Sequence, residues 1–319
     1  MKSLIKKFMP MVDVLLAPFV YVAARVLRVV RRFGVKRVPL CKSILFKVGI
    51  FPIINHYYEP QFNFTEKEHS FSDERELPGI DWNVKGQLEL LESLSFSQEL
   101  ENTPISKVDD LHFYFDNPTF GSGDAEYWYQ LIRLKKPKNI IEIGSGHSTL
   151  MAINAICKNE DENSEYKCQH ICIEPYEMPW LEKTKVTVVR KKVEDVNVSF
   201  FSKLDEGDVL FIDSSHMIRP DGDVVFEYLQ LLPTLKKGVI VHVHDIFSPR
   251  NYPDAWLRDD IRFWNEQYLL EAFLTHNSSW KIIASLNYLQ HNHYEKLKEI
   301  CPFLNESREP GSFYLQKTA

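Results

Sequence analysis

Short apolar runs alternate with longer amphipathic stretches over the second half of the chain. Five runs of four or five residues, rich in isoleucine and valine, predict strands at 139–143, 170–173, 186–189, 208–212 and 239–242. Helical patterns fill the intervals, for example at 150–157 and 221–235. Strands separated by helices predict an α/β fold with a doubly wound, mostly parallel, Rossmann-like sheet.

The flanking patterns extend this sheet. A helix is expected to begin at residue 124, another covers one edge of the core at 87–101, and a long one occupies 258–275. Two short apolar runs near the C-terminus, 280–284 and 312–316, predict an antiparallel edge. Residues 61–80 are polar and contain Pro and Gly, which is typical of a loop.

Charge divides the chain unevenly. Residues 1–50 hold eleven Lys and Arg against one acid, Asp13, although the whole chain has a net charge of −6. The rest of the chain is therefore acidic, which disfavours nucleic acid as a partner. We separate three parts: a basic amphipathic segment at 1–58, a loop and helical cap at 59–123, and the main domain at 124–319.

The basic segment has several interpretations. Its longest uncharged run, 14–24, has eleven residues and is shorter than a typical membrane-spanning helix. Apolar residues continue between arginines after this run, which favours an amphipathic helix on an anionic membrane surface. Docking on the main domain, or on a second subunit of a homo-oligomer, is an alternative. Val22-Ala23-Ala24 also resembles a signal-peptidase site.

The five cysteines are odd in number and widely scattered. This favours a reducing compartment over a disulfide framework. We therefore expect a cytoplasmic protein, with peripheral contact to the inner membrane surface through residues 1–50.

The strand at 139–143 runs directly into Gly144-Ser145-Gly146, and a polar His147-Ser148-Thr149 then opens a helix. Strand, glycine turn and helix form the opening unit of a nucleotide-binding α/β fold. Glycines let the backbone turn tightly and let a ligand approach it, and amides at the helix start can donate to that ligand. Thr149 stands where the third glycine of a dinucleotide fingerprint would be, and no Lys-Ser/Thr pair follows, so a triphosphate loop is disfavoured.

Polar residues also follow the other strands, at the ends where open α/β sheets bind ligands. Glu174 is suited to hold the two hydroxyls of a ribose, and Glu194 stands where an adenine amino group can be recognised. The fourth strand ends at 213–216 and the fifth at His244 and Asp245. Each of these residues has a structural alternative, as a solvated acid or a hydrogen-bonded core histidine.

This order of motifs resembles the class I S-adenosylmethionine-dependent methyltransferases. The matching stretches are E-I-G-S-G at 142–146, the acid Glu174, F-I-D-S-S-H at 211–216 and G-V-I-V-H-V-H-D-I-F at 238–247. The resemblance covers about residues 105–319. It is closest to a bacterial branch that includes sugar and macrolide O-methyltransferases.

The resemblance implies methylation of a hydroxyl on a sugar, glycan or other small-molecule acceptor, with S-adenosylmethionine as the donor. The expected donor-binding residues are Glu142, Gly144, Ser145, Gly146, Ser148, Glu174, Glu194 and Asp213. The expected catalytic residues are His216, His244 and Asp245, with the histidines as candidate bases. Asp213 and Asp245 can hold a divalent cation such as Mg²⁺, although Ile246 stands where metal-dependent relatives often carry an amide residue.

Three other classes stay open at this point. One is a nicotinamide-dependent oxidoreductase or epimerase, which the missing third glycine and the lack of a Tyr-x-x-x-Lys pair disfavour. Another is a metal-dependent hydrolase built on His242, His244 and Asp245. The third is a cofactor-binding scaffold without catalysis. Fold analogy does not identify the acceptor, because its pocket comes from loops, here 51–123 and 246–280.

Overall fold

The computed structural model describes residues 2–61, 70–176 and 178–319. Residues 62–69 of the loop expected at 61–80 lie outside the described residues. The chain divides into two compact units, Met1–Glu68 and His69–Ala319, and each is described by itself.

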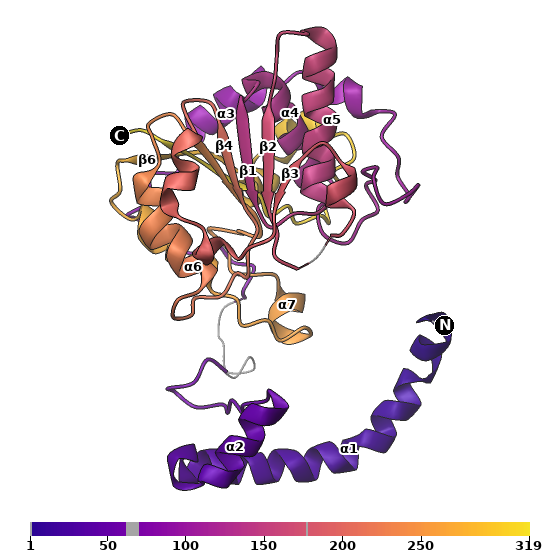
Figure 1. Ribbon diagram of the computed structural model, residues 1–319, viewed down its shortest axis with the longest axis vertical. Helices are drawn as coiled ribbons and strands as arrows, with labels where there is room; N and C mark the ends of the chain where they lie inside the picture. Colours follow the sequence, from indigo (N-terminus) through magenta and orange to yellow (C-terminus); the bar gives the residue numbers. More distant parts are fainter. Residues whose placement is uncertain (1, 62–69, 177) are drawn as a thin grey trace. The chain divides into compact units, whose positions relative to one another are not determined.

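A seven-stranded sheet forms the core of the unit His69–Ala319, with the strand order β3-β2-β1-β4-β5-β7-β6 (Figure 1). The first five strands are parallel, and β7 runs antiparallel between β5 and β6. The predicted fold class is therefore confirmed: a doubly wound, Rossmann-like methyltransferase sheet with its antiparallel pairing at the C-terminal edge. The strands are β1 Asn139–Ile143, β2 Gln169–Ile173, β3 Thr187–Val189, β4 Val209–Ile212, β5 Ile240–Val243, β6 Trp280–Ser285 and β7 Phe313–Lys317.

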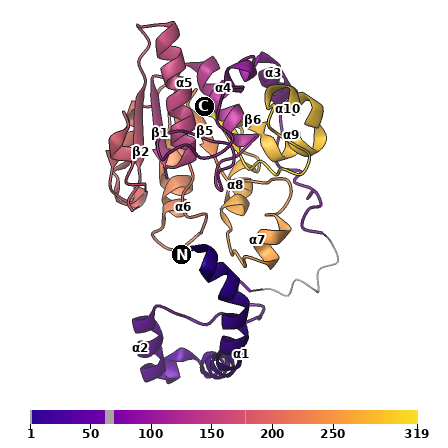
Figure 2. The same ribbon diagram turned by 90° about the vertical axis from the view of Figure 1, so that its right-hand side faces the viewer.

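Both faces of the sheet are covered, which is why the strands read as continuous apolar runs. Ile140 belongs to the core on one face, with helices α4 and α5, and Ile141 belongs to the core on the other, with α6 and α8. Figures 1 and 2 show these helices on the two sides of the sheet. Their bounds are α4 Asp124–Lys135, α5 His147–Glu162, α6 Asp223–Phe226 and α8 Glu266–Leu274.

Helices from both ends of this unit lie side by side near β6 (Figure 2). They are α3 Val84–Ser93, α9 Leu286–Asn292 and α10 Tyr294–Ile300. Trp82, just before α3, stacks on Tyr288 of α9 with 5.6 Å between ring centroids. The segment before residue 124 therefore covers an edge of the core, as predicted.

The single long helix expected at 258–275 is wrong. The chain instead forms α7 Asp254–Arg258, a loop, and then α8. Ile261 takes a left-handed backbone with φ of 54°, which a continuing helix forbids. The Arg262 guanidinium lies over the rings of Trp256 and Trp264, at 4.3 and 4.6 Å from their centroids. These contacts override the helical spacing.

Two other predicted helices are also interrupted. The stretch at 87–101 splits into α3 and a 3₁₀ turn, η3 Ser97–Leu100, because the backbone N–H of Phe96 donates to the Gln130 side chain at 2.9 Å. The stretch at 221–235 continues from α6 as a wide turn, η7 Glu227–Leu231, and a 3₁₀ turn, η8 Leu232–Thr234. The remaining short 3₁₀ turns of this unit are η4 Leu181–Lys183, η5 Val193–Asp195 and η6 Val198–Lys203.

The unit Met1–Glu68 is built on one long helix, α1 Lys2–Phe33, which contains Pro10 and Pro18. Gly34, with φ of +81°, ends α1, and a 3₁₀ turn, η1 Val35–Arg37, leads to α2 Pro39–Val48. The stretch Phe8–Phe33 is long and apolar enough to cross a membrane by length and composition.

Candidate functional site

The site begins where the ends of β1 and β4 touch. Gly144 follows β1 with φ of +79°, and a Cβ there would lie 2.0 Å from the carbonyl oxygen of Asp213, which follows β4. Only glycine therefore fits at this position. Gly146 differs, because its backbone is extended and a Cβ would come no closer than 4.0 Å to Met178.

The Glu142 carboxylate lies behind the glycine turn and is fully buried. It accepts hydrogen bonds from Thr149 Oγ1 at 2.6 Å and Ser148 Oγ at 3.3 Å, and His170 Nε2 lies 2.7 Å from its other oxygen. Burial disfavours a charged imidazole, but Cys172 and Glu142 together raise the pKa of His170 to about 10. Glu142 thus ties β1 to β2 and to the first turn of α5, which fixes the turn.

A hollow of about 390 Å³ opens in front of the turn. Four of the expected donor-binding residues line it: Gly144, Glu174, Glu194 and Asp213. Glu174 is buried, and its carboxylate accepts a hydrogen bond from the backbone N–H of Tyr176 at 3.0 Å. The other four expected residues do not line it: Ser145 and Gly146 belong to the turn, and Glu142 and Ser148 lie behind it.

The residues expected to carry catalysis come together beside this hollow. His216 Nε2 lies 3.2 Å from Asp213 and 3.6 Å from Asp245. His244 Nδ1 lies 3.6 Å from Asp213 and 3.5 Å from Asp245, and its Nε2 is 3.9 Å from Asp124. We call the four residues Asp213, His216, His244 and Asp245 the catalytic cluster, after the role that the sequence leads us to expect for the last three.

Two members of the cluster have a left-handed backbone. His216 and Asp245 both have φ of 58°, a region that residues other than glycine rarely adopt. Such conformations cost about 1–3 kcal/mol each and are concentrated at functional sites. The sequence gives no sign of this strain.

Glu266 is a site residue that the sequence analysis missed. Its carboxylate is fully buried, lies 2.8 Å from His216 Nδ1 and accepts a hydrogen bond from the Tyr228 hydroxyl at 3.0 Å. The backbone N–H groups of Asn265 and Glu266 also donate to the carbonyl oxygen of His216, at 3.0 and 3.2 Å. Trp264 covers the imidazole, with 4.3 Å between ring centroids. Glu266 therefore orients His216 so that Nε2 faces the two aspartates.

The charges within the cluster depend on one another. Burial disfavours the charged imidazoles, but Asp213 and Glu266 raise the pKa of His216 well above its ordinary value. Asp245 and Asp213 likewise raise the pKa of His244 well above its ordinary value, against the effect of burial. Burial also opposes ionisation of Asp213, but the two histidines outweigh it and lower the pKa of this carboxyl group. For Asp245 burial prevails, and the pKa is raised. The two histidines therefore retain their protons at a higher pH than an ordinary imidazole does.

His242 lies on β5, the strand that leads to His244, but its surroundings are different. Both of its ring nitrogens are buried without a hydrogen-bond partner among the described residues. The ring stacks on Tyr314 at 4.1 Å between centroids and contacts Phe211 and Trp128. Burial lowers its pKa, so His242 is a neutral core residue. This does not favour the hydrolase interpretation, which needs it as a ligand.

Tyr252 and Trp256 lie within 246–280, one of the two regions expected to form the acceptor pocket. Tyr252 is buried, and its hydroxyl accepts a hydrogen bond from the backbone N–H of Gln267 at 3.1 Å. Both rings pack against Phe247, with 6.1 and 5.1 Å between centroids. Their contacts are those of core packing around α8.

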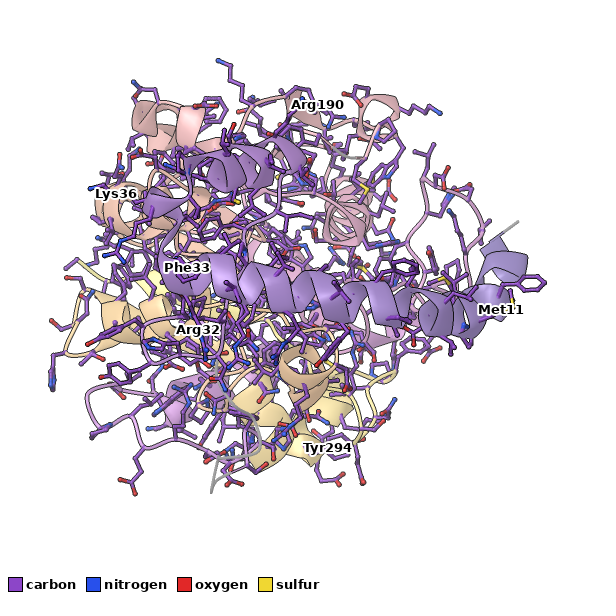
Figure 3. The ribbon with its side chains drawn as sticks, turned by 90° about the horizontal axis from the view of Figure 1, so that it is seen from below. Met11, Arg32, Phe33, Lys36, Arg190 and Tyr294 are labelled. Carbon is purple, nitrogen blue, oxygen red and sulfur yellow. The ribbon has the colours of Figure 1, made fainter. Side chains whose placement is uncertain are left out.

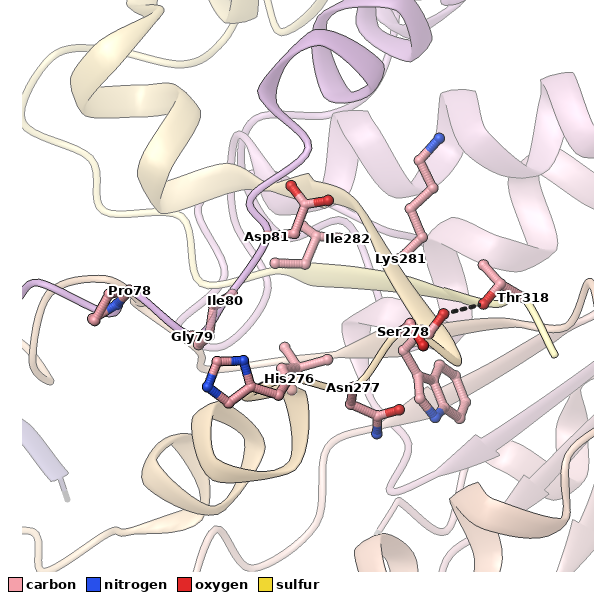
Figure 4. A pocket seen from close by; sticks show the side chains of 12 residues that line it. Pro78, Gly79, Ile80, Asp81, His276, Asn277, Ser278, Lys281, Ile282 and Thr318 are labelled. Carbon is pink, nitrogen blue, oxygen red and sulfur yellow. Dashed lines mark hydrogen bonds between the residues drawn. The ribbon is translucent and has the colours of Figure 1, made fainter.

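A second, larger hollow of about 590 Å³ lies at the other end of the sheet (Figure 4). It is lined by residues before α3, by the loop that enters β6, and by Thr318, whose hydroxyl donates to the carbonyl oxygen of Ser278 at 2.8 Å. Trp280 begins β6 and pairs with Lys317 at the end of β7, so this hollow is at the amino end of the parallel strands. Ligands of open α/β sheets bind at the carboxyl end, which leaves this hollow outside the site.

The sheet order and the glycine turn define a Rossmann-like methyltransferase fold. Residues 141–246 match the family model described as "Methyltransferase domain", so this domain includes the turn, the hollow and the whole catalytic cluster.

An "Uncharacterized protein" of Archaeoglobus fulgidus is 31% identical over 179 residues, which cover 52% of this chain and 79% of that protein. The chain belongs to the same family as this archaeal protein.

Two kinds of solved structure are similar in part. The plantazolicin methyltransferase BpumL in complex with SAH has a TM-score of 0.36 and 15% identity, covering 62% of this chain and 84% of that chain. A putative protein-L-isoaspartate O-methyltransferase from Plasmodium falciparum has a TM-score of 0.26 and 12% identity, covering 52% and 78%. At such low values, neither likeness bears on what this chain does.

The contact between Gly144 and Asp213 leads to a prediction about two glycines. Gly144→Ala should lower the free energy of unfolding by more than about 1 kcal/mol, because alanine is strained at positive φ and its Cβ meets backbone. Gly146→Ala is the matched control and should change it little, since the site is extended and open. Urea unfolding followed by tryptophan fluorescence measures both, and equal effects would contradict the assignment.

Proposed function

We propose that this protein is an S-adenosylmethionine-dependent methyltransferase that acts on a hydroxyl of a sugar, glycan or other small molecule. One observation carries the proposal: Asp213 belongs both to the wall of the hollow and to the catalytic cluster. A donor held in the hollow is therefore adjacent to groups that can take a proton from an acceptor. The family-model match supports methyl transfer, and the resemblance of the strand-end motifs to O-methyltransferases supports a hydroxyl acceptor.

The lining of the hollow fits the proposed donor. Gly144 places no side chain between the turn and a ligand, and its neighbour Ser145 keeps a buried hydroxyl without a partner among the described residues. Glu174 offers a carboxylate at the end of β2, where a ribose binds in this fold. Glu194 lines the same hollow and can accept a hydrogen bond from an adenine amino group.

S-adenosylmethionine supplies an electrophilic methyl group on a sulfonium, so the protein's main task is to position the acceptor oxygen. A hydroxyl must also lose its proton as the new bond forms, and a positioned base assists this. We assign the base to His216 in its neutral form, in which Glu266 holds the proton on Nδ1 and Nε2 can receive one. The raised pKa of His216 means that this form appears only as the imidazolium loses its Nε2 proton at higher pH. Asp213 and Asp245 flank Nε2 and stabilise the imidazolium.

The same cluster offers ligands for a divalent cation. One ligand atom each from Asp213, His216 and Asp245 lies within 4.8 Å of the other two. Two carboxylates and an imidazole suit Mn²⁺ better than Mg²⁺, which prefers oxygen alone. The cation would compete with the protons that the cluster holds. It would supply a positive charge that lowers the pKa of a bound hydroxyl, in place of His216 acting as the base, because both roles use the same Nε2.

Donor binding is tested by calorimetric titration with S-adenosylhomocysteine. The wild-type chain should bind it and should not respond to NADH. Glu174→Ala should weaken binding by about tenfold or more, because a charged hydrogen bond to the ligand is lost. Glu165→Ala removes an exposed acid of the same domain and should change nothing. Tight NADH binding without a response to S-adenosylhomocysteine would overturn the proposal.

The base is tested by measuring S-adenosylhomocysteine formation with a panel of sugar hydroxyl acceptors. His216→Gln should lower turnover by about 10²- to 10⁴-fold, while affinity for S-adenosylhomocysteine stays within about twofold. His276→Gln is the control, since His276 lies in the hollow at the opposite end of the sheet. If His216→Gln retains full turnover, His216 is not the base.

The cation is tested by titration with Mn²⁺ and Mg²⁺ alone. We expect Mn²⁺ to bind more tightly than Mg²⁺, and Asp245→Asn to abolish binding of both. Glu165→Asn serves as the matched control. No heat of binding for either ion would remove the cation from the proposal.

A further inference from the structure

The largest exposed apolar surface in the described residues belongs to the unit Met1–Glu68. Phe19 and Val14 of α1 are 74% and 71% exposed, and Leu40 of α2 is 79% exposed. The apolar side chains of α1 that share this exposure are Phe8, Met9, Met11, Val12, Val14, Leu15, Leu16, Phe19, Val20, Val22, Val26, Val29 and Phe33. Contiguous apolar surfaces of this kind mark a site that meets a partner or a membrane.

Most apolar residues of α1 lie on the side of the helix opposite the arginines near its C-terminal end, whereas Val14 lies on the same side as Arg32. Apolar residues recur every three or four positions, at Phe8, Val12, Leu15, Phe19, Val22 and Val26. The arginines near the C-terminal end, Arg25, Arg28, Arg31 and Arg32, follow the same spacing on the opposite side. Figure 3 shows α1 from below, with Met11 towards one end and Arg32, Phe33 and Lys36 gathered at the other.

A groove on the basic side is built for an anion. It has a volume of about 960 Å³ and lies between the end of α1 and residues 52–61. Arg28, Arg31, Arg32 and His56 line it. Arg31 forms an ion pair with Glu59, but its Nε is buried without a partner among the described residues. Within the described part of the chain, the side chains of Arg28 and Arg32 form no ion pair.

We propose that α1 lies in the plane of an anionic lipid bilayer, with its apolar side in the acyl layer and the arginine groove on lipid phosphates. A bilayer offers an apolar layer directly beneath a layer of negative charge. The apolar side of α1 would meet the first layer, and the arginines on the opposite side would meet the second. The exposed apolar residues of the unit His69–Ala319, such as Ile105, Leu229 and Ile261, come from separate elements. Among the described residues, they therefore form no continuous apolar surface that could cover the apolar side of α1.

A second copy of the chain is a less suitable partner for the apolar side of α1 than a bilayer. Two α1 helices would bring two basic segments together, because residues 1–50 carry eleven Lys and Arg against one acid. Pro10 and Pro18 also interrupt α1, and prolines kink or break the regular repeat that a helix–helix seam requires.

The helix suits the surface of a bilayer better than a path across it. The uncharged run at 14–24 rises about 16 Å as a helix, whereas the hydrocarbon layer is about 30 Å thick. Asp13 and four arginines fall within the stretch Phe8–Phe33, and charges at the centre of a bilayer are costly. Membrane binding is independent of the methyl-transfer proposal.

The test is sedimentation of the purified full chain with vesicles of phosphatidylcholine, with or without one quarter phosphatidylglycerol. Wild-type protein should bind the anionic vesicles at least tenfold better than the neutral ones, and added salt should reduce the difference. Leu15→Glu/Phe19→Glu should weaken binding more than tenfold. Arg28→Gln/Arg32→Gln should weaken binding to anionic vesicles about 10- to 30-fold and leave binding to neutral vesicles unchanged.

Matched variants in the other unit serve as controls. Lys183→Gln/Lys185→Gln removes two exposed charges, and Val108→Glu/Leu229→Glu adds two acids at exposed apolar positions. Neither should alter sedimentation. All six tryptophans lie in the unit His69–Ala319, so their fluorescence verifies that every variant keeps this unit folded.

Five outcomes would overturn the proposal, four of them on membranes and one on a second copy of the chain. The first is equal binding to neutral and anionic vesicles, and the second is unchanged binding by Leu15→Glu/Phe19→Glu. The third is resistance of the bound chain to carbonate extraction, which indicates a helix that spans the bilayer. The fourth is a chain in membrane fractions that begins after Ala24, which indicates a cleaved signal peptide. Vesicle-independent dimers abolished by Leu15→Glu/Phe19→Glu, without vesicle binding, would assign the surface to a second copy instead.

Discussion

The site depends on how closely the backbone after β1 approaches the end of β4. These two strands are neighbours in the sheet although about seventy residues separate them in the sequence. The turn after β1 passes so near the carbonyl oxygen of Asp213 that Gly144 cannot carry a side chain. This close approach places the turn beside the end of β4, where the Asp213 carboxylate lines the hollow and also meets His216 and His244.

A second constraint is the amount of charge that the fold holds away from water. Glu142 is buried, and the cost of its burial is offset by His170, Ser148 and Thr149. Glu266 is buried in the same way between His216 and Tyr228. Removing any one partner would leave a buried carboxylate with fewer hydrogen bonds to offset its burial, so these networks hold the site in one arrangement.

The sheet and the strand ends could be predicted from the sequence for a physical reason. Most residues of the parallel strands are apolar on both faces, so each apolar run ends near polar residues that reach the edge of the sheet, as at Asp213 and Asp245. The resemblance of these strand ends to methyltransferases follows from the same residues. The helix bounds were less predictable, because contacts between distant side chains break the helical spacing. Arg262 between Trp256 and Trp264 is one case, and Gln130 on the backbone of Phe96 is another.

Glu266 could not be found from the sequence, since nothing in its neighbourhood marks it as the partner of a residue fifty positions earlier. The left-handed backbone of His216 and Asp245 was equally hidden, because neither residue is a glycine. Likewise the carboxyl group of Glu142 suggested a ligand for the donor, whereas its position behind the turn appears only once Thr149 and His170 are placed in space.

The attachment of His216 to Asn265 and Glu266 couples the imidazole to the loop that precedes α8. Loops vary more in length than the elements they connect, and here the end of the loop and the first residue of α8 supply both backbone donors and the carboxylate that hold the imidazole. Any lengthening or shortening of this loop moves the start of α8 and, with it, His216 Nε2. A change in the loop can therefore alter the contacts of Asp213 and Asp245 without any substitution at those two residues.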